Sequence, residues 1–265
     1  MATPLDDLTT LATADRLLRD SRATGAGVRV AVIDSGVERA VLAERHPTMR
    51  PIQGGLFRAS YSDPLPYEGH QSAPHGTTVA DVILTVAPEC ELYSADVFGP
   101  AGSCEVETVV RALQYVVDHW NCKVINLSLG VPESRLQPVQ RRNALLRAIE
   151  EAYYRDVLVV AAAHNDHPLT RSYPAAFAPP LVSVDKGLFT DPFSFAYKLR
   201  DQVEFQAHAR GYLGPFAAEP ATSWAAPHVA GIAARLASLK PDIKPFEFKT
   251  LLYWMSQRGT GGRES

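Results

Sequence analysis

Three short segments place a carboxylate, an imidazole and a hydroxyl at the ends of apolar runs. Asp34 closes the run VRVAVID at 28–34, His75 begins the helical pattern HGTTVADVILTV, and Ser223 begins the pattern SWAAPHVAGIAARLASL. A carboxylate at the carboxyl end of a parallel strand faces the crevice where α/β sheets bind ligands. A hydroxyl at a helix N-terminus lies beside free N–H groups that could hold an oxyanion. These residue types could together support nucleophilic catalysis.

Each of the three residues also has a purely structural interpretation. The Asp-Ser-Gly sequence that begins at Asp34 is ordinary turn chemistry. A lone histidine such as His75 is more often a hydrogen-bonded loop residue than a base, and Ser223 could simply cap its helix. Pro227 fits this helix only in the first turn, where its missing N–H would be unpaired in any case. The chemistry therefore depends on a fold that brings the three residues together.

The elements that must position these residues alternate along the chain. Nearly continuous apolar runs predict strands buried on both faces, as in a parallel sheet, at 28–34, 90–98, 123–130, 157–163 and 180–185. Helical patterns lie between and after them at 75–86, 106–120, 139–156, 223–239 and 245–257. This alternation predicts an α/β fold with right-handed crossovers.

Composition limits the class of protein. The chain has 265 residues, of which 46% are hydrophobic and 21% charged, so we expect one large globular domain. A formal net charge of -3 gives no field to attract a nucleic acid. The first residues lack the pattern of a secretion signal, and no run is long enough to span a membrane. Cys90, Cys104 and Cys122 lack metal-site spacing, which predicts reduced thiols and no metal site.

The local sequences resemble the three signature blocks of the subtilisin-like serine proteases (subtilases, peptidase S8). VAVIDSGV surrounds Asp34, HGTTVAD begins with His75, and TSWAAPHVAG contains Ser223, in the Asp, His, Ser order known in subtilisin. VINLSLG resembles the substrate-binding strand, and VVAAAHND resembles the strand that ends in the oxyanion asparagine, here Asn165. The resemblance implies a three-layer subtilisin-like α/β fold, with a mostly parallel central sheet flanked by helices.

The chemistry implied by this resemblance is peptide-bond hydrolysis without a cofactor or metal. Ser223 attacks a peptide carbonyl, His75 moves the proton, Asp34 orients the imidazole, and the Asn165 side chain and the Ser223 N–H stabilise the oxyanion. The resemblance also implies that substrate binds as an extended strand between two segments. The residues expected to bind substrate are Gly102, Ser103, Cys104, Ser128, Leu129, Gly130 and His164.

Four positions depart from the family pattern by carrying larger side chains. Ala221 and His164 stand where Gly is usual, Trp224 replaces Met, and Val131 replaces a second Gly. We expect these changes to enlarge side chains around the primary pocket, and Ala221 to be unfavourable if its backbone needs a positive φ. The sequence thus predicts selective cleavage, such as processing of a precursor or leader peptide. The segment after His75 is also short, which predicts that the calcium-binding loop of secreted subtilisins is absent.

The expected organisation is a helical extension at 1–24, a peptidase domain at 25–258 and a flexible tail at 259–265. The extension is too short for the folding segment of secreted relatives, so the enzyme either folds unaided in the cytoplasm or was cut from a larger polypeptide. The expected partner is a peptide or protein substrate, with no nucleic acid and no membrane.

Two alternatives remain open. The first is a catalytically impaired subtilase relative that binds extended peptides without cutting them. The intact set of Asp34, His75, Asn165 and Ser223 argues against this alternative. The second is a sedolisin-type acid peptidase, which would need a glutamate at the position of His75.

Overall fold

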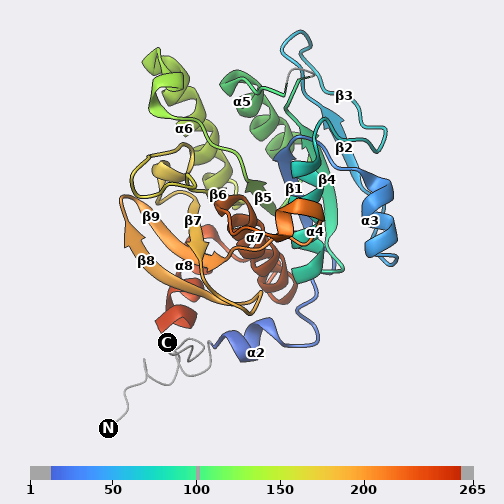
Figure 1. Cartoon of the computed structure of the whole chain (residues 1–265), viewed down its shortest axis with the longest axis vertical. Coiled ribbons are helices and arrows are strands. Elements are labelled where there is room, and N and C mark those ends of the chain that lie inside the picture. The colour runs from blue at the N-terminus through green and yellow to red at the C-terminus, as the bar shows by residue number, and fades with distance from the viewer. Residues whose placement is uncertain (1–12, 100–101, 258–265) are drawn as a thin grey trace.

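The computed structural model describes residues 13–99 and 102–257. Within these ranges the strands form one nine-stranded sheet in the order β3-β2-β4-β1-β5-β6-β7-β9-β8 (Figure 1). The strands are β1 (Arg29–Asp34), β2 (Gln53–Leu56), β3 (Leu65–Pro66), β4 (Glu91–Asp96), β5 (Val124–Leu127), β6 (Leu158–Ala162), β7 (Val182–Gly187), β8 (Phe195–Arg200) and β9 (Val203–His208).

The sheet is parallel except at its two edges. Strands β2, β4, β1, β5, β6, β7 and β9 pair in parallel, whereas β3 joins β2 and β8 joins β9 in antiparallel fashion. In the register of β1 and β4, Asp34 lies opposite Asp96, so two carboxylates end neighbouring strands. The mostly parallel sheet is therefore confirmed.

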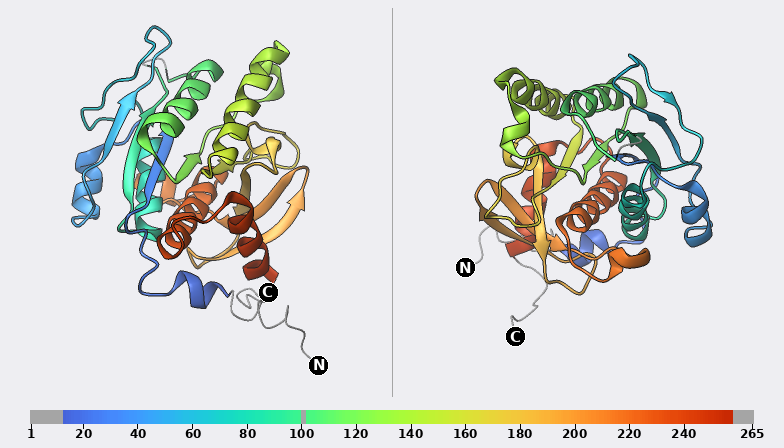
Figure 2. Two further views of the ribbon diagram at one scale, coloured as in Figure 1. Left: turned by 180° about the vertical axis from the view of Figure 1, so that it is seen from behind. Right: turned by 45° about the horizontal axis from the view of Figure 1, so that its top comes forward.

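Helices cover both faces of this sheet (Figures 1 and 2). Their bounds are α2 (Ala14–Leu18), α3 (Arg39–Arg45), α4 (Pro74–Val86), α5 (Val106–Tyr115), α6 (Val139–Tyr154), α7 (Thr222–Leu239) and α8 (Pro245–Gln257). A π-helical turn at Val116–Trp120 extends α5, and 3₁₀ turns lie at Glu133–Leu136, Ala175–Phe177 and Gly214–Ala217.

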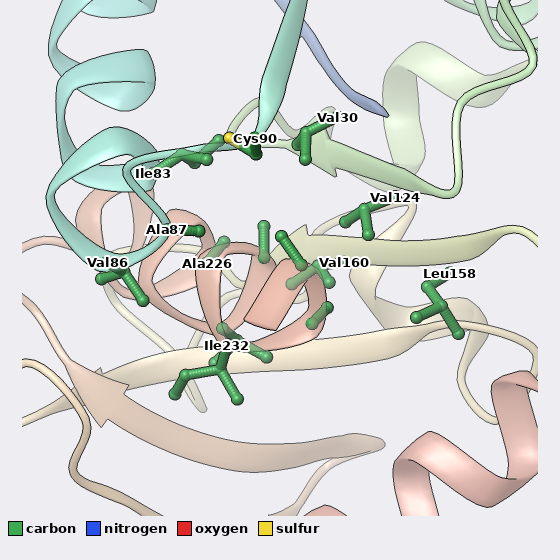
Figure 3. Close-up of a cluster of buried hydrophobic side chains, with 14 of the residues drawn as sticks. Val30, Ile83, Val86, Ala87, Cys90, Val124, Leu158, Val160, Ala226 and Ile232 are labelled. Carbon is green, nitrogen blue, oxygen red and sulfur yellow. The ribbon is translucent and has the colours of Figure 1, made fainter. Parts of the chain in front are cut away.

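The pleat of β1 shows how the layers are built. Val30 and Val32 belong to one buried cluster, which includes side chains of α4, α7 and α8, whereas Ala31 and Ile33 belong to a second cluster with α5 and α6. Successive strand residues point to opposite faces, so a continuous apolar run fills both layers. Figure 3 shows the first cluster, where Val30 of the sheet lies near Ile83 of α4.

Helices α4 and α7 approach each other closely because Gly231 has no side chain. A Cβ atom at this position would lie 2.6 Å from Val86 Cβ, closer than real Cβ contacts. The first turns of these two packed helices contain His75 in α4 and Ser223 in α7.

All five predicted strands and five predicted helices are found, with ends that shift by a few residues. No apolar run or helical pattern predicted α3, β2, β3, β8 or β9. Part of the expected extension at 1–24 is helical: α2 packs against the domain, and Arg235 Nε of α7 donates to Leu18 O at 2.7 Å. Residues 1–12 and the tail at 259–265 lie outside the described residues, and the domain boundaries stay predictions.

Candidate active site

Asp34 is held at the end of β1 by several donors. Its carboxylate is 1% exposed and accepts a hydrogen bond from Ser35 N–H at 2.7 Å, and Ser35 Oγ lies 3.1 Å from its Oδ1. His75 Nδ1 lies 2.9 Å from Oδ1 and 3.1 Å from Oδ2 of the same carboxylate. Gly76 allows this approach, because a Cβ there would lie 2.2 Å from Gly36 O. Asp34 and His75, which are 41 residues apart in the sequence, thus form a hydrogen-bonded pair.

The Ser35 hydroxyl also positions the start of α4. It donates to Ala73 O at 2.9 Å and accepts from Gly76 N–H at 3.0 Å, so it bonds on both sides of His75. No role for this serine was predicted from the sequence. Its place directly after Asp34 is the only sequence signal for the role, because Asp and Ser side chains both bond to nearby backbone groups.

The contact with Asp34 sets the proton position on His75. A carboxylate can only accept, so Nδ1 carries the proton and Nε2 is left with a free lone pair in the neutral ring. Burial, the largest single influence, lowers the pKa of His75, but the charge of Asp34 and its hydrogen bond together outweigh it. The net pKa of His75 is raised above its ordinary value of 6.5. The ring is 32% exposed, so it is open to one side.

The other side of the His75 ring is covered by Trp224 and Phe216. The ring centroids of His75 and Trp224 are 5.0 Å apart, and those of His75 and Phe216 are 6.5 Å apart. Trp224 is only 4% exposed. The expectation that Trp224 enlarges a wall of the primary pocket is therefore wrong: its side chain turns from α7 toward α4 and packs beneath the imidazole.

Ser223 lies in the first turn of α7, one residue before Trp224, whose ring contacts His75. Its Oγ is 3.4 Å from Ser128 O, and among the described residues no hydrogen bond joins it to the imidazole. The Ser223 N–H likewise has no acceptor within the described ranges. Catalytic hydrogen bonds are often long in structures without substrate, so this geometry is compatible with a nucleophile and its base.

Pro227 lies in the second turn of α7 and not, as expected from the sequence, in the first. Its missing N–H removes the helical bond that Ser223 O would otherwise accept. Ser128 Oγ replaces it, donating to Ser223 O at 2.9 Å while accepting from Asn126 Nδ2 at 2.9 Å. Because of Pro227, the Ser223 carbonyl oxygen is free to accept from Ser128, and this bond connects Ser223 to the segment at 128–130.

Asn165 follows β6 and lies beside the start of α7. Thr222 N–H donates to Asn165 Oδ1 at 3.0 Å, and Thr222 Oγ1 lies 3.1 Å from the same atom. Because a backbone N–H can only donate, the atom that faces it must be the amide oxygen. The Asn165 NH₂ group therefore points elsewhere, and the exposed residue leaves it available to an incoming oxyanion.

The two expected substrate segments face each other across one cleft of about 720 Å³. Gly102, Ser103 and Cys104 line one part, and Leu129, Gly130 and Val131 line another. Val131 is held by paired backbone bonds with Tyr173 at 2.9 and 3.0 Å. The structure thus brings together the two segments that the sequence predicted as a substrate clamp, although Ser128 lies behind the cleft, bonded to Ser223.

The remaining departures have local explanations. Ala221 adopts φ -140° and ψ 154°, an extended conformation, so its methyl group causes no backbone strain. His164 is half-buried, and its Nδ1 accepts from Asp166 N–H at 3.1 Å, outside the lining of the cleft. Of the four enlarged positions, only Val131 lines this cleft.

Asp96 is a buried group that the sequence analysis missed. It lies beside Asp34 on β4, is 1% exposed, and is paired with Arg58 at 3.2 Å. Its carboxylate also accepts from Ser72 Oγ at 2.5 Å and Phe98 N–H at 3.0 Å. It therefore connects the loop before His75 to the loop that leads into the cleft. Its position at the end of an apolar run, like that of Asp34, was the available signal.

The cysteines are free thiols, as the sequence predicted. Cys104 lines the cleft, but burial, followed by the charge of Asp34, raises its pKa to about 12. It is protonated at neutral pH, which makes it a poor nucleophile.

Neither a metal cluster nor a membrane span is found in the described parts of the chain. Within residues 13–99 and 102–257, no three His, Cys, Asp or Glu side chains are grouped to hold a metal ion. Across the same ranges, no helix combines the length and the hydrophobicity needed to cross a bilayer.

The fold and site define an α/β protein with an Asp–His pair facing a serine at a helix N-terminus. The model of the subtilase family matches residues 25–185 and 201–264, and the chain belongs to this family. M-protease of Shouchella clausii is 34% identical over 234 residues, which cover 83% of this chain and 56% of that protein. Subtilisin E of Bacillus subtilis is 31% identical over 238 residues, which cover 82% and 57%. The chain therefore spans little more than half the length of these curated relatives.

Solved structures agree on the fold. The S41 psychrophilic protease has a TM-score of 0.69 at 25% identity, covering 89% of this chain and 86% of that one. Sphericase has a TM-score of 0.68 with the same coverage, and at 21% identity it supports the fold alone.

Proposed function

We propose that this chain is a serine endopeptidase in which Ser223 is the nucleophile, His75 the base and Asp34 the group that orients the base. The observation that carries the proposal is the Asp34–His75 pair, 2.9 Å apart, facing the N-terminus of α7. Membership in the subtilase family supports the same activity.

The proposed reaction follows from the proton positions. His75 Nε2 accepts the Ser223 proton as Oγ attacks the peptide carbonyl, and the imidazolium is stabilised by Asp34 through Nδ1. The imidazolium then protonates the leaving amine, and water hydrolyses the acyl-enzyme by the same route. The raised pKa of His75 suits both roles near neutral pH, because it brings the base close to the operating pH.

The oxyanion would form beside two unused donors. Asn165 has its Oδ1 occupied by Thr222, which leaves its NH₂ group free, and the Ser223 N–H has no acceptor within the described ranges. Donors that are oriented before the reaction need no reorganisation as charge develops. We propose that these two groups bind the oxyanion.

We further propose that cleavage is selective and serves the processing of a precursor or leader peptide in the cytoplasm. Support for selectivity comes from the cleft, where Val131 stands at a position that is commonly Gly in the family. The ion pair of Arg141 and Glu107, at 2.5 Å, adds a charged border to the same cleft. The substrate would bind as an extended strand between the segments at 102–104 and 129–131.

Hydrolysis of an unfolded protein and of a peptide library tests the proposal. Wild-type protein is expected to cleave both, with a strong preference among library sequences, and Ser223→Ala is expected to be inactive while keeping its circular dichroism spectrum. Equal cleavage after many residue types would contradict selectivity. Absence of cleavage by folded protein on every peptide would contradict the endopeptidase itself.

A non-cleaving peptide-binding module is the second candidate. It is favoured by one observation, the contact of Ser223 Oγ with Ser128 O in place of His75. This candidate predicts that library peptides bind, as measured by calorimetry, with equal affinity to wild-type and Ser223→Ala proteins, and are recovered intact from both.

A further inference from the structure

Two aromatic side chains form a wall against the imidazole of His75, and we call Trp224 and Phe216 the aromatic wall. The Trp224 and His75 rings are inclined by 37°, with centroids 5.0 Å apart, so the imidazole packs against the indole. Phe216 meets the same imidazole at 83° and 6.5 Å. The two wall residues contact each other, with centroids 5.1 Å apart.

Trp224 is built into the core, and Phe216 is a partly buried residue packed against the same cluster. Trp224 is 4% exposed and belongs to the hydrophobic cluster around α4 and α7. Gly211 leaves room for it, because a Cβ at that position would lie 3.3 Å from Trp224 Cδ2 and 3.0 Å from Thr78 Cγ2. A buried indole with this packing has few alternative rotamers, so it stays in contact with the imidazole.

We propose that Trp224 is a positioning residue for His75: its indole holds the imidazole in line with Asp34 and stabilises the imidazolium that forms when Ser223 transfers its proton. This inference rests on the proposed function, since it assigns a role to Trp224 in the same reaction. It assigns no direct contact with substrate to the indole.

The physical basis is the negative face of the aromatic ring. A cation within about 6 Å of a ring centroid is attracted by the ring quadrupole, most strongly by Trp and more when water is excluded. A wall of aliphatic side chains would exclude water equally well, which disfavours the charged form, but would offer no such attraction. The aromatic wall therefore shields one side of His75 without the full penalty of burial.

The charged groups around His75 do not account for stabilisation of the imidazolium on the side of the aromatic wall. Asp34 of β1 bonds to Nδ1, and Asp96 of β4, beside Asp34, is paired with Arg58. The Cys104 thiol of the cleft is neutral at pH 7. Trp224 of α7 and Phe216 of the 3₁₀ turn carry no charge, so their effect on the imidazole comes from the rings themselves.

An NMR titration of the His75 imidazole tests the proposal without needing catalysis. The titration is made on full-length protein in a Ser223→Ala background, and His75→Gln identifies the resonance among the eight histidines. Trp224→Leu is expected to lower the pKa of His75 by about half a unit to one unit, because the apolar volume remains but the ring face is lost. Trp224→Phe is expected to keep most of the parent value, and Trp254→Leu, on α8, is the matched control that leaves it unchanged.

Phe216→Leu provides a second test if Trp224→Leu does not fold, and it is expected to lower the same pKa by a smaller amount. With active protein, Trp224→Leu is expected to lower kcat with little change in KM, and Trp224→Phe to restore most of the loss. An unchanged or raised pKa of His75 in the folded Leu variants would overturn the proposal. Failure of the proposed function would instead appear as absent cleavage, with the pKa shifts still present.

Discussion

The candidate site consists of two halves that are built differently. The proton-handling half contains Asp34, Ser35 and His75, where a buried carboxylate holds the imidazole through short hydrogen bonds. The substrate-facing half contains Asn165 and Ser223, where the amide is exposed and the Ser223 hydroxyl has one long contact at 3.4 Å.

The difference reflects when each half acts. The proton-handling half must have its tautomer and orientation in place before substrate arrives, and the fold supplies both through the ends of β1 and α4. The substrate-facing half must bind groups that arrive with the substrate, so its free donors, the Asn165 NH₂ and the Ser223 N–H, are unoccupied within the described ranges. We therefore expect changes in the first half to disturb proton transfer, and changes in the second to disturb transition-state binding.

The largest effect is expected from Asp34→Asn. The amide offers an N–H as well as an oxygen to His75 Nδ1, so the imidazole can take the wrong tautomer and lose its function as a base. Peptide hydrolysis assays are expected to show kcat reduced by about 10⁴-fold. Asp185→Asn, a change at another buried carboxylate of the sheet, is the matched control and should leave kcat within about threefold of wild type. Equal losses in the two variants would remove the distinction between Asp34 and an ordinary buried carboxylate.

Asn165→Ala tests the other half. Loss of one oxyanion donor is expected to lower kcat by about 10²- to 10³-fold with little change in KM, because the donor acts in the transition state. Asn143→Ala, at an exposed position of α6, is the control. A rise in KM at constant kcat would show that Asn165 binds the ground state, and would place it outside the oxyanion site.

His228 offers a further comparison with His75, because it is fully buried in α7. Its Nδ1 donates to Trp224 O at 2.7 Å, so in the neutral ring its Nε2 accepts from Tyr212 O–H at 2.8 Å. Burial is the main cause that lowers the pKa of His228 to about 3.

The lowered pKa of His228 predicts acid instability. The unfolded chain binds the proton near pH 6.5 and the folded chain only near pH 3, so stability falls as pH decreases through this window. At pH 5 the contribution is a loss of about 2 kcal/mol relative to pH 7. Urea unfolding at both pH values is expected to show this loss in wild type and a smaller one in His228→Gln. An equal loss in both proteins would assign the acid sensitivity to other groups.

The smallest effect concerns the pH profile of His75. Activity requires the neutral imidazole, and the raised pKa means that kcat/KM increases with pH through a midpoint above 6.5. The raised pKa of His75 also stabilises the folded state below about pH 6.5. This contribution to the free energy of unfolding is lost as pH rises through the folded-state pKa of His75. A midpoint of kcat/KM below pH 6.5 in wild type would contradict the conclusion that Asp34 raises the pKa of His75 more than burial lowers it.

The central strands could be predicted because their signals are local, whereas the Asp34–His75 pair was expected from the resemblance to the subtilases. Buried parallel strands are continuous apolar runs, and the polar residues that end them meet at one edge of the sheet. The edge hairpin of β8 and β9 gave no such signal. Its turn residues Asp201 and Gln202 adopt positive φ values of 38° and 71° without the glycine that normally marks such a turn.

The direction of Trp224 could not be predicted for a different reason. A large residue beside the nucleophile was interpreted as a pocket wall, but side-chain direction depends on where α7 packs against α4. Gly211 and Phe216, which receive the indole, are more than seven residues away in sequence and give no periodic pattern with it. The hydrogen bond from Ser128 Oγ to Ser223 O, the carbonyl that Pro227 leaves without a helical donor, likewise joins distant segments.

Labelling with a fluorophosphonate, followed by intact-protein mass spectrometry, tests the central claim most directly, because the reagent modifies only an activated serine. Wild-type protein is expected to gain a single adduct on Ser223, Ser223→Ala none, and Asp34→Asn and His75→Ala adducts at rates lower by orders of magnitude. No adduct on folded wild-type protein, or an adduct that persists in Ser223→Ala, would contradict the assignment of Ser223 as the nucleophile activated by His75 and Asp34.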